Sequence, residues 1–354
     1  MTGSAAGRTA WLDRAVSLPP DASPPAHVFN TREWLEAWER TTIEKTLGAS
    51  YLHRGDGSTT TPYYCIESSP FWDAYEIEAG VEPIWPGPVV FSPSVYSIYG
   101  GGLADPDSIR QAVDLGLTQA GEWDAGALLF VNMQADEARR WMEHRPPFTA
   151  ILLDLAHGAP LQATVDDQLA GVRGRVRRDF RRQWRRARER GVSLLELRGR
   201  EMRPWLGEFQ RLASATSERH SADMYDLPTF QALSDVPGAT LLTAERDGRM
   251  LGAFLAFGYR QRFYLWTAGL DYETLKQFGT YAFLMYESVD FAIREGHRAL
   301  EVGRGNSSFK ERHGFRGAEL WTLVYLTDRW AEDRALQSRL SAMERGLLRH
   351  LGLA

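Results

Sequence analysis

One stretch of this chain, residues 239–315, carries an ordered series of predicted elements that limits the possible fold more than any other feature. Two apolar runs flank Asp247-Gly248, a pattern typical of a β-hairpin. A third strand, a helix and a fourth strand follow, and Gly296 is placed to end the helix. The segments concerned are ATLLTAE (239–245), MLGAFLAFGY (250–259), FYLWTAGL (263–270), LKQFGTYAF (275–283), ALEV (299–302), GRGNSSFKERHGF (303–315) and WTLVYL (321–326). The helix has one apolar side, formed by Phe278, Ala282, Met285, Val289 and Ile293.

The first half of the chain repeats this plan in weaker form. Thr31 is expected to cap a short helix, a hairpin is expected at 51–66 through Asp56-Gly57, and Asp107 is expected to cap a helix between strands. The predicted fold is therefore mixed α/β, with two similar domains, each a mixed central sheet flanked by helices. The expected boundaries are a flexible leader at 1–26, domains at 27–157 and 158–327, and a C-terminal helix at 328–354 that packs on the second domain. The boundary is set at His157–Pro160, a cluster of residues that break regular structure.

At 354 residues the chain is long enough for two domains of ordinary size. It has no apolar run that would span a bilayer and no apolar signal core at its start. The single cysteine, Cys65, has no partner for an internal disulfide and no neighbouring metal ligands. These features predict a cytoplasmic protein without a membrane span or a metal site.

Charge is divided unevenly between the halves. Residues 1–150 hold 10 basic and 20 acidic side chains, so the remaining residues hold 31 basic and 26 acidic ones. Only three of the 41 basic residues are lysines: Lys45, Lys276 and Lys310. A polyanionic partner is therefore expected to bind the second half.

The strongest concentration of charge is a predicted helix that begins after Thr164 and ends at Gly191. Ten of its eighteen residues from Arg173 to Arg190 are arginines. Repeated arginines offer contacts for the phosphates of RNA, but charged stretches are more often solvated helix faces. The interleaved aromatic residues, Phe180 and Trp184, have the spacing of core residues, which favours packing over base stacking.

The order of elements at 239–315 resembles the GNAT superfamily of acyl-coenzyme A N-acyltransferases. Asn306 followed by His313-Gly314-Phe315 is similar to that superfamily's closing pattern. Two such halves joined by a basic helix resemble the Fem family and its relatives with a BioF2-like acetyltransferase domain. Four segments carry this resemblance: FNTREWLEAW at the start, RRDFRRQWRRARERGV (177–192), ATSERHSADMYDLPTFQAL (215–233) with Thr216 and Arg219, and SFKERHGF (308–315) with Phe309-Lys310.

The resemblance implies an amide-forming aminoacyl transferase that uses charged tRNA as co-substrate and holds no permanent cofactor. Its acceptor would be a small-molecule or peptide amine of cell-wall or secondary-metabolite biosynthesis. The chain lacks the coiled-coil arm of some Fem proteins and a lysine for a substrate diphosphate, which argues against the cell-wall precursor itself as acceptor. The alternatives are transfer from an acyl-coenzyme A such as acetyl-CoA, and a non-catalytic relative that binds an anionic partner.

Several side chains are candidates for the site. By resemblance, Lys310 stabilises the developing oxyanion or the leaving oxygen; the other interpretation is a surface lysine paired with Glu311 or another carboxylate. Glu301 is the candidate base. The candidates for binding the acceptor are Arg219, Tyr225, Trp266 and Tyr99.

Two segments are candidates for binding the donor. Arg178, Arg181, Arg182 and Arg185 of the basic helix are expected to contact tRNA. The turn formed by Lys276, Gln277, Gly279 and Thr280 is expected to present backbone N–H groups to phosphates at a helix start, although a single glycine before a helix is often only a turn. In coenzyme A-dependent relatives a second small residue is expected where this chain has Tyr281.

Overall fold

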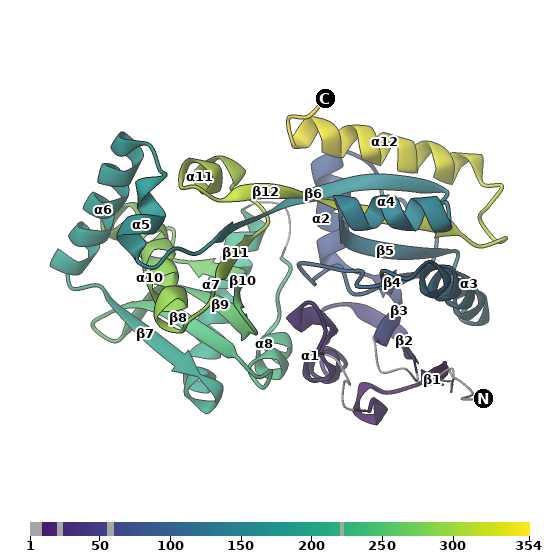
Figure 1. Cartoon of the computed structure of the whole chain (residues 1–354), viewed down its shortest axis with the longest axis horizontal. Helices are drawn as coiled ribbons and strands as arrows, with labels where there is room; N and C mark the ends of the chain where they lie inside the picture. Colours follow the sequence, from purple (N-terminus) through teal and green to yellow (C-terminus); the bar gives the residue numbers. More distant parts are fainter. Residues whose placement is uncertain (1–8, 20–23, 55–59, 220–222) are drawn as a thin grey trace, which may run out of the picture. The chain divides into compact units, whose positions relative to one another are not determined.

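The computed structural model describes residues 9–19, 24–54, 60–219 and 223–354 (Figure 1). The chain divides into two compact units, one formed by Met1–Asp154 and Glu319–Ala354 and the other by Leu155–Ala318. Strands β6 (Thr149–Pro160) and β12 (Arg316–Leu326) each contribute residues to both units.

The other elements fall entirely within one unit. The first unit contains β1 (Ala10–Leu12), η1 (Ala15–Ser17), η2 (Val28–Asn30), α1 (Arg32–Trp38), β2 (Lys45–His53), β3 (Thr60–Ser68), α2 (Pro70–Ala79), β4 (Val89–Ser92), α3 (Pro106–Glu122), β5 (Ala127–Gln134), α4 (Ala135–His144) and α12 (Arg334–His350). The second unit contains α5 (Val165–Ala170), α6 (Gly174–Glu189), β7 (Ser193–Arg198), η3 (Gly199–Trp205), α7 (Leu206–Glu218), α8 (Leu227–Leu233), β8 (Ala239–Arg246), β9 (Arg249–Tyr259), β10 (Arg262–Leu270), α9 (Leu275–Phe278), α10 (Thr280–Arg294), β11 (Ala299–Gly303) and α11 (Ser307–Arg312).

The two units have the same strand pairing. In the first, β2, β3 and β4 pair antiparallel in sequence, and β4 then pairs parallel with β5 after the crossover through α3. In the second, β8, β9 and β10 pair antiparallel, and β10 pairs parallel with β11 after the crossover through α10. The predicted mixed α/β class and the predicted repeat of one plan in both halves agree with this pairing.

The last strand of each repeat comes from a distant part of the chain. In the first unit β12 pairs antiparallel with β5, and in the second unit β6 pairs antiparallel with β11. Helix α12 packs on α2 within the first unit. The predicted packing of the C-terminal helix on the second domain is therefore wrong, because β12 leads the chain back into the first unit.

Three local predictions also need correction. Residues His157–Pro160 do not break the chain but continue β6, because the missing side chain of Gly158 leaves room for Glu301 opposite. Asp105, not Asp107, caps α3, and its carboxylate accepts from the Ser108 N–H at 2.8 Å. The predicted long basic helix is two helices: α5 ends before Gly171–Arg173, and α6 begins after it.

Part of the predicted leader is ordered. Strand β1 pairs antiparallel with β2, Trp11 lies 5.3 Å from the Tyr63 ring, and the Ala15 N–H donates to the Glu39 carboxylate at 2.7 Å. The remaining leader residues 1–8 and 20–23, and the predicted turn at Asp56-Gly57, lie outside the described residues. The strands on either side of that turn do pair as the predicted hairpin.

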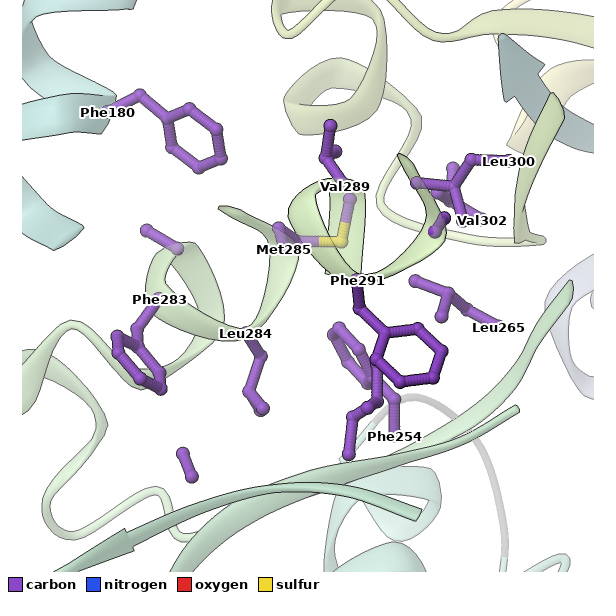
Figure 2. Packing of buried hydrophobic residues seen from close by; sticks show 14 of the residues in the cluster. Phe180, Phe254, Leu265, Phe283, Leu284, Met285, Val289, Phe291, Leu300 and Val302 are labelled. Carbon is purple, nitrogen blue, oxygen red and sulfur yellow. The ribbon is translucent and has the colours of Figure 1, made fainter. Parts of the chain in front are cut away.

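The core of the second unit lies between α10 and one face of its sheet. Figure 2 shows Met285, Val289 and Phe291 of α10 beside Leu300 and Val302 of β11. Along β9, Phe254 and Ala256 belong to this core, whereas Phe257 lies on the other face against Trp266. Helices α7 and α8 cover that other face through an aromatic cluster of Phe209, Tyr225, Phe230 and Trp266.

Replacing Gly346 by alanine is expected to destabilise the first unit by about 1–3 kcal/mol, the usual range for overpacking. A Cβ at residue 346 of α12 would overlap the carbonyl oxygen of Ala79 in α2. Gly121→Ala is the matched control, since it lies in α3 with no atom within 4 Å of the added Cβ. Thermal unfolding measures both variants. Equal melting temperatures for Gly346→Ala and the wild type would contradict this packing of α12.

Glu44 is a buried carboxyl group that makes the first unit sensitive to pH. Burial raises its pKa to about 7, although Ser94, Ser69 and Trp38 donate hydrogen bonds to it. Because the pKa is higher in the folded state, the free energy of unfolding should fall as pH rises from about 5 to 8, by an amount on the order of 3 kcal/mol. Burial likewise raises the pKa of Glu76 to about 7. The two carboxyl groups together should therefore account for a loss of about twice that amount. Glu44→Gln should remove about half of the combined loss, measured by urea unfolding at several pH values; an unchanged slope would contradict the assignment.

Candidate functional site

A large recess lies over α6 on the α10 face of the second unit. Its volume is about 1290 Å³, above the usual range of small-molecule pockets. Its lining comes from α5, α6, α10 and α11 and the residue after α11: Asp166, Arg175, Val176, Arg178, Asp179, Arg181, Arg182, Gln183, Trp184, Arg185, Tyr286, Phe309, Arg312 and His313. We call it the arginine recess. It brings together all four arginines that the sequence predicts for tRNA contact.

The arginines of the recess differ in their partners. Arg181 pairs with Asp166, and Arg182 pairs with Asp179. Burial acts to raise the pKa of Asp179, but hydrogen bonds from Gln183 and Arg182 outweigh it, so the pKa is lowered and the carboxylate stays charged. Arg175, Arg178 and Arg185 form no ion pair with any described residue and are exposed. Arg312 is likewise exposed and forms no ion pair with a described residue. These four guanidinium groups are therefore available to phosphates.

Aromatic rings contribute the less polar part of the recess. Trp184 stacks on Tyr286 at 4.6 Å, and its indole N–H donates to Glu287 at 2.8 Å. Phe309 stacks on His313 at 3.9 Å. Phe180 is buried, as its spacing predicts, whereas Trp184 is half-buried and both packs against the core and lines the recess.

Lys310 is buried in α11, with only 3% of its surface exposed. Its ammonium group donates to the carbonyl oxygens of Gly303 at 3.0 Å and Arg304 at 2.7 Å, at the end of β11. The interpretation as a surface lysine paired with Glu311 is wrong: Glu311 lies 3.7 Å from the buried His157 instead. Lys310 is not among the residues that line the arginine recess, but its neighbour Phe309 is. Helix α11 therefore contributes Phe309 to the recess and Lys310 to the end of β11.

Strand β11 runs beside only the first part of β10, up to Leu265, whose carbonyl oxygen lies 3.1 Å from where a Cβ of Gly303 would be. Their parallel pairing covers Arg262–Tyr264 against Ala299–Glu301. Beyond it, β10 has a bulge at Trp266, and the N–H of its last residue, Leu270, donates to the Thr216 hydroxyl of α7 at 3.0 Å. The two strands therefore diverge at the end where Lys310 lies.

Two of the predicted acceptor-binding residues meet on the α7 face of this diverging end. The Trp266 and Tyr225 rings are 5.7 Å apart and edge to face. Burial raises the pKa of Tyr225, and its side chain contacts that of Thr267. The arginine recess and the Tyr225–Trp266 pair thus lie on opposite faces of the second unit's sheet.

Three other predicted residues have different surroundings. Arg219 is exposed at the end of α7, with its guanidinium 4.3 Å from the centre of the Tyr272 ring. Glu301 is 5% exposed and paired with Arg262, which gives this carboxylate a structural role, while its role as base stays a prediction. Tyr99 is buried in the first unit with its ring 4.9 Å from His27.

The turn predicted to hold phosphates lies beside the recess. Lys276 and Gln277 are exposed on α9, Thr280 is buried, and Gly279 between α9 and α10 has a φ of +65° that favours glycine. The Gln183 side chain lies 3.8 Å from where a Cβ of Gly279 would be, and Arg190 donates to the Gln277 carbonyl. The α6 helix therefore lies against this turn.

Four residues that line the recess were not among the predicted site residues: Arg175, Arg312, Tyr286 and His313. His313 follows Phe309 by four residues, so a helical interpretation of 307–313 would have put both on one face. Tyr286 has no such signal, because its place in the recess depends on how α10 packs against α6.

Part of the second unit matches a known family by sequence. Residues 174–311 match the family of acetyltransferase (GNAT) domains. The predicted acyltransferase class agrees with this match. No curated protein matches the chain by sequence.

Solved structures extend the likeness over most of the chain. FemX is 14% identical with a TM-score of 0.57, covering 87% of this chain and 94% of that one. The C-terminal domain of a putative lysylphosphatidylglycerol synthetase from Agrobacterium fabrum is 10% identical with a TM-score of 0.55, covering 90% and 92%. L-PGS from Bacillus licheniformis is 12% identical with a TM-score of 0.54, covering 84% and 90%. At these identities the likeness establishes a shared fold. Among the described residues, no helix is both long and apolar enough to cross a bilayer.

Proposed function

We propose that this chain transfers an aminoacyl group from a charged tRNA to an amine acceptor. The arginine recess is the observation that carries this assignment: six arginines surround aromatic rings, and four of them have no ion pair among the described residues. Such a surface fits a phosphate chain with bases beside it. The fold shared with FemX and with proteins named as lysylphosphatidylglycerol synthetases supports the choice of an aminoacyl donor.

The diverging end of β10 and β11 is the proposed place of reaction. A neutral amine held near Tyr225 and Trp266 attacks the ester carbonyl carbon, the new C–N bond forms, and the bond from carbon to the ribose oxygen breaks. The amine's proton passes to a base, for which Glu301 remains the candidate, and then to the leaving ribose oxygen. Lys310 supplies positive charge to the developing oxyanion, and its ammonium group also holds the carbonyls of Gly303 and Arg304 in place.

An acyl-coenzyme A donor is the second candidate, favoured by the match to the acetyltransferase domain family. The surroundings of the turn at Gly279 argue against a coenzyme A donor. Tyr281, which stands after this glycine, packs its ring 4.9 Å from Phe309 and bonds to the Asn306 side chain. The Gln183 side chain also lies beside this turn, 3.8 Å from where a Cβ of Gly279 would be.

Two binding measurements separate the donors. The purified protein should bind charged tRNA in a complex that RNase destroys and that weakens steeply with salt. Acetyl-CoA should leave its melting temperature unchanged. Stabilisation by acetyl-CoA without any binding of tRNA would replace the first candidate by the second.

A further inference from the structure

His313 is the one imidazole in the lining of the arginine recess. Its Nδ1 lies 2.7 Å from the Phe309 carbonyl oxygen. A carbonyl oxygen only accepts, so Nδ1 carries the proton in this hydrogen bond. In the neutral ring the other nitrogen, Nε2, is then an acceptor.

The ring faces of His313 are already in contact with aromatic neighbours. Phe309 lies at 3.9 Å and nearly parallel, and Phe180 lies at 4.6 Å and tilted. With both rings against it and Nδ1 bonded to the backbone, the polar atom that remains for a ligand is Nε2. This edge belongs to a half-buried side chain that lines the recess.

The other charged groups of the recess have different roles. Its arginines only donate hydrogen bonds, and the carboxylates of Asp166 and Asp179 are engaged by Arg181 and Arg182. Burial lowers the pKa of His313, helped by Arg312 and opposed by the Phe309 hydrogen bond and by Asp179. The ring is therefore neutral at neutral pH, and Nε2 is an uncharged acceptor in a surface of donors.

We infer that His313 reads the ribose 2′-hydroxyl of RNA bound in the arginine recess, an assignment that rests on the proposed function. The 2′-hydroxyl is the group that distinguishes RNA from DNA, and it donates to an acceptor such as Nε2. The arginines contact phosphates, which RNA and its sugar-modified analogues share. Affinity would then come from the arginines and selection of the sugar from His313.

The test compares one hairpin with the sequence of a tRNA acceptor arm in two forms, RNA and its 2′-fluoro analogue. The analogue keeps the phosphates and the RNA-like helix but has no hydroxyl to donate. Wild-type protein should bind the RNA about fivefold to tenfold more tightly, the effect of one net hydrogen bond. His313→Phe keeps a stacking ring but no acceptor, so its ratio should be close to one with unchanged affinity for the analogue. His313→Gln, which restores an acceptor, should recover much of the ratio.

The pH dependence is a second readout. Below the lowered pKa of His313 the ring gains a proton and Nε2 changes from an acceptor to a donor. The binding ratio of the two hairpins should therefore change with pH in the wild type but not in His313→Phe, while both hairpins bind the protonated wild type more tightly. Equal binding of both hairpins by the folded wild type, or an undiminished ratio in His313→Phe, would overturn the assignment to His313 but not the proposed function. Failure of the wild type to bind either hairpin would instead overturn the proposed function and the assignment with it.

Discussion

Lys310→Met is expected to lower the rate of transfer by about 100-fold or more, the usual cost of removing one group that stabilises an oxyanion. Methionine keeps most of the buried stem but not the charge, so the variant removes the ammonium group that donates to Gly303 and Arg304. Because Lys310 does not line the arginine recess, the affinity for tRNA should stay unchanged. The loss should therefore appear in kcat and not in KM for tRNA.

Lys45→Ala is the control for this variant, since Lys45 is an exposed lysine of the first unit paired with Glu67. Its kcat should equal that of the wild type. Circular dichroism and thermal unfolding establish that Lys310→Met is folded before its rate is compared. A folded Lys310→Met that retains more than about a tenth of the wild-type kcat would exclude Lys310 from catalysis.

The double variant Arg178→Ala/Arg185→Ala is expected to weaken tRNA binding roughly 10-fold to 100-fold at low salt. Both guanidinium groups line the recess and form no ion pair with a described residue. If each contacts one phosphate, the slope of log K against log salt should become shallower by about 1.5 to 2. Filter binding or fluorescence anisotropy over a range of salt concentrations measures both quantities.

The double variant Arg200→Ala/Arg203→Ala also removes two positive charges, but from η3, outside the recess. This control should keep the wild-type salt slope. Removing charge outside the binding surface changes the rate of encounter but leaves the number of phosphate contacts unchanged. An equal loss of affinity in both double variants would mean that the recess is not the RNA-binding surface.

The local parts of the fold follow from sequence because they depend on neighbouring residues. The turn at Asp247-Gly248 has positive φ at both positions, as its residue types predict, and Thr31 caps α1 through the Trp34 N–H. Ala282, Met285 and Val289 of α10 are buried as their spacing predicts, whereas Ile293 is only partly buried. These features need no knowledge of distant partners.

The allocation of the final strand does not follow from sequence. The run WTLVYL predicts a buried strand equally well in either unit, and only its pairing with β5 places most of β12 in the first one. The burial of Lys310 could not be predicted from the sequence for a similar reason. In the sequence, a lysine between Phe309 and Glu311 is typical of an exposed helical residue. Only the structure shows that the turn at Gly303–Arg304 supplies carbonyl partners for its buried ammonium group.

Transfer of a radiolabelled amino acid from charged tRNA to amines of a small-molecule extract tests the central assignment most directly. The wild type should produce labelled amide faster than the uncatalysed reaction, RNase pretreatment should abolish the product, and Lys310→Met should reduce it about 100-fold. If labelled acetyl-CoA yields acetylated amines with the wild type while charged tRNA yields no product, this protein is not an aminoacyl transferase.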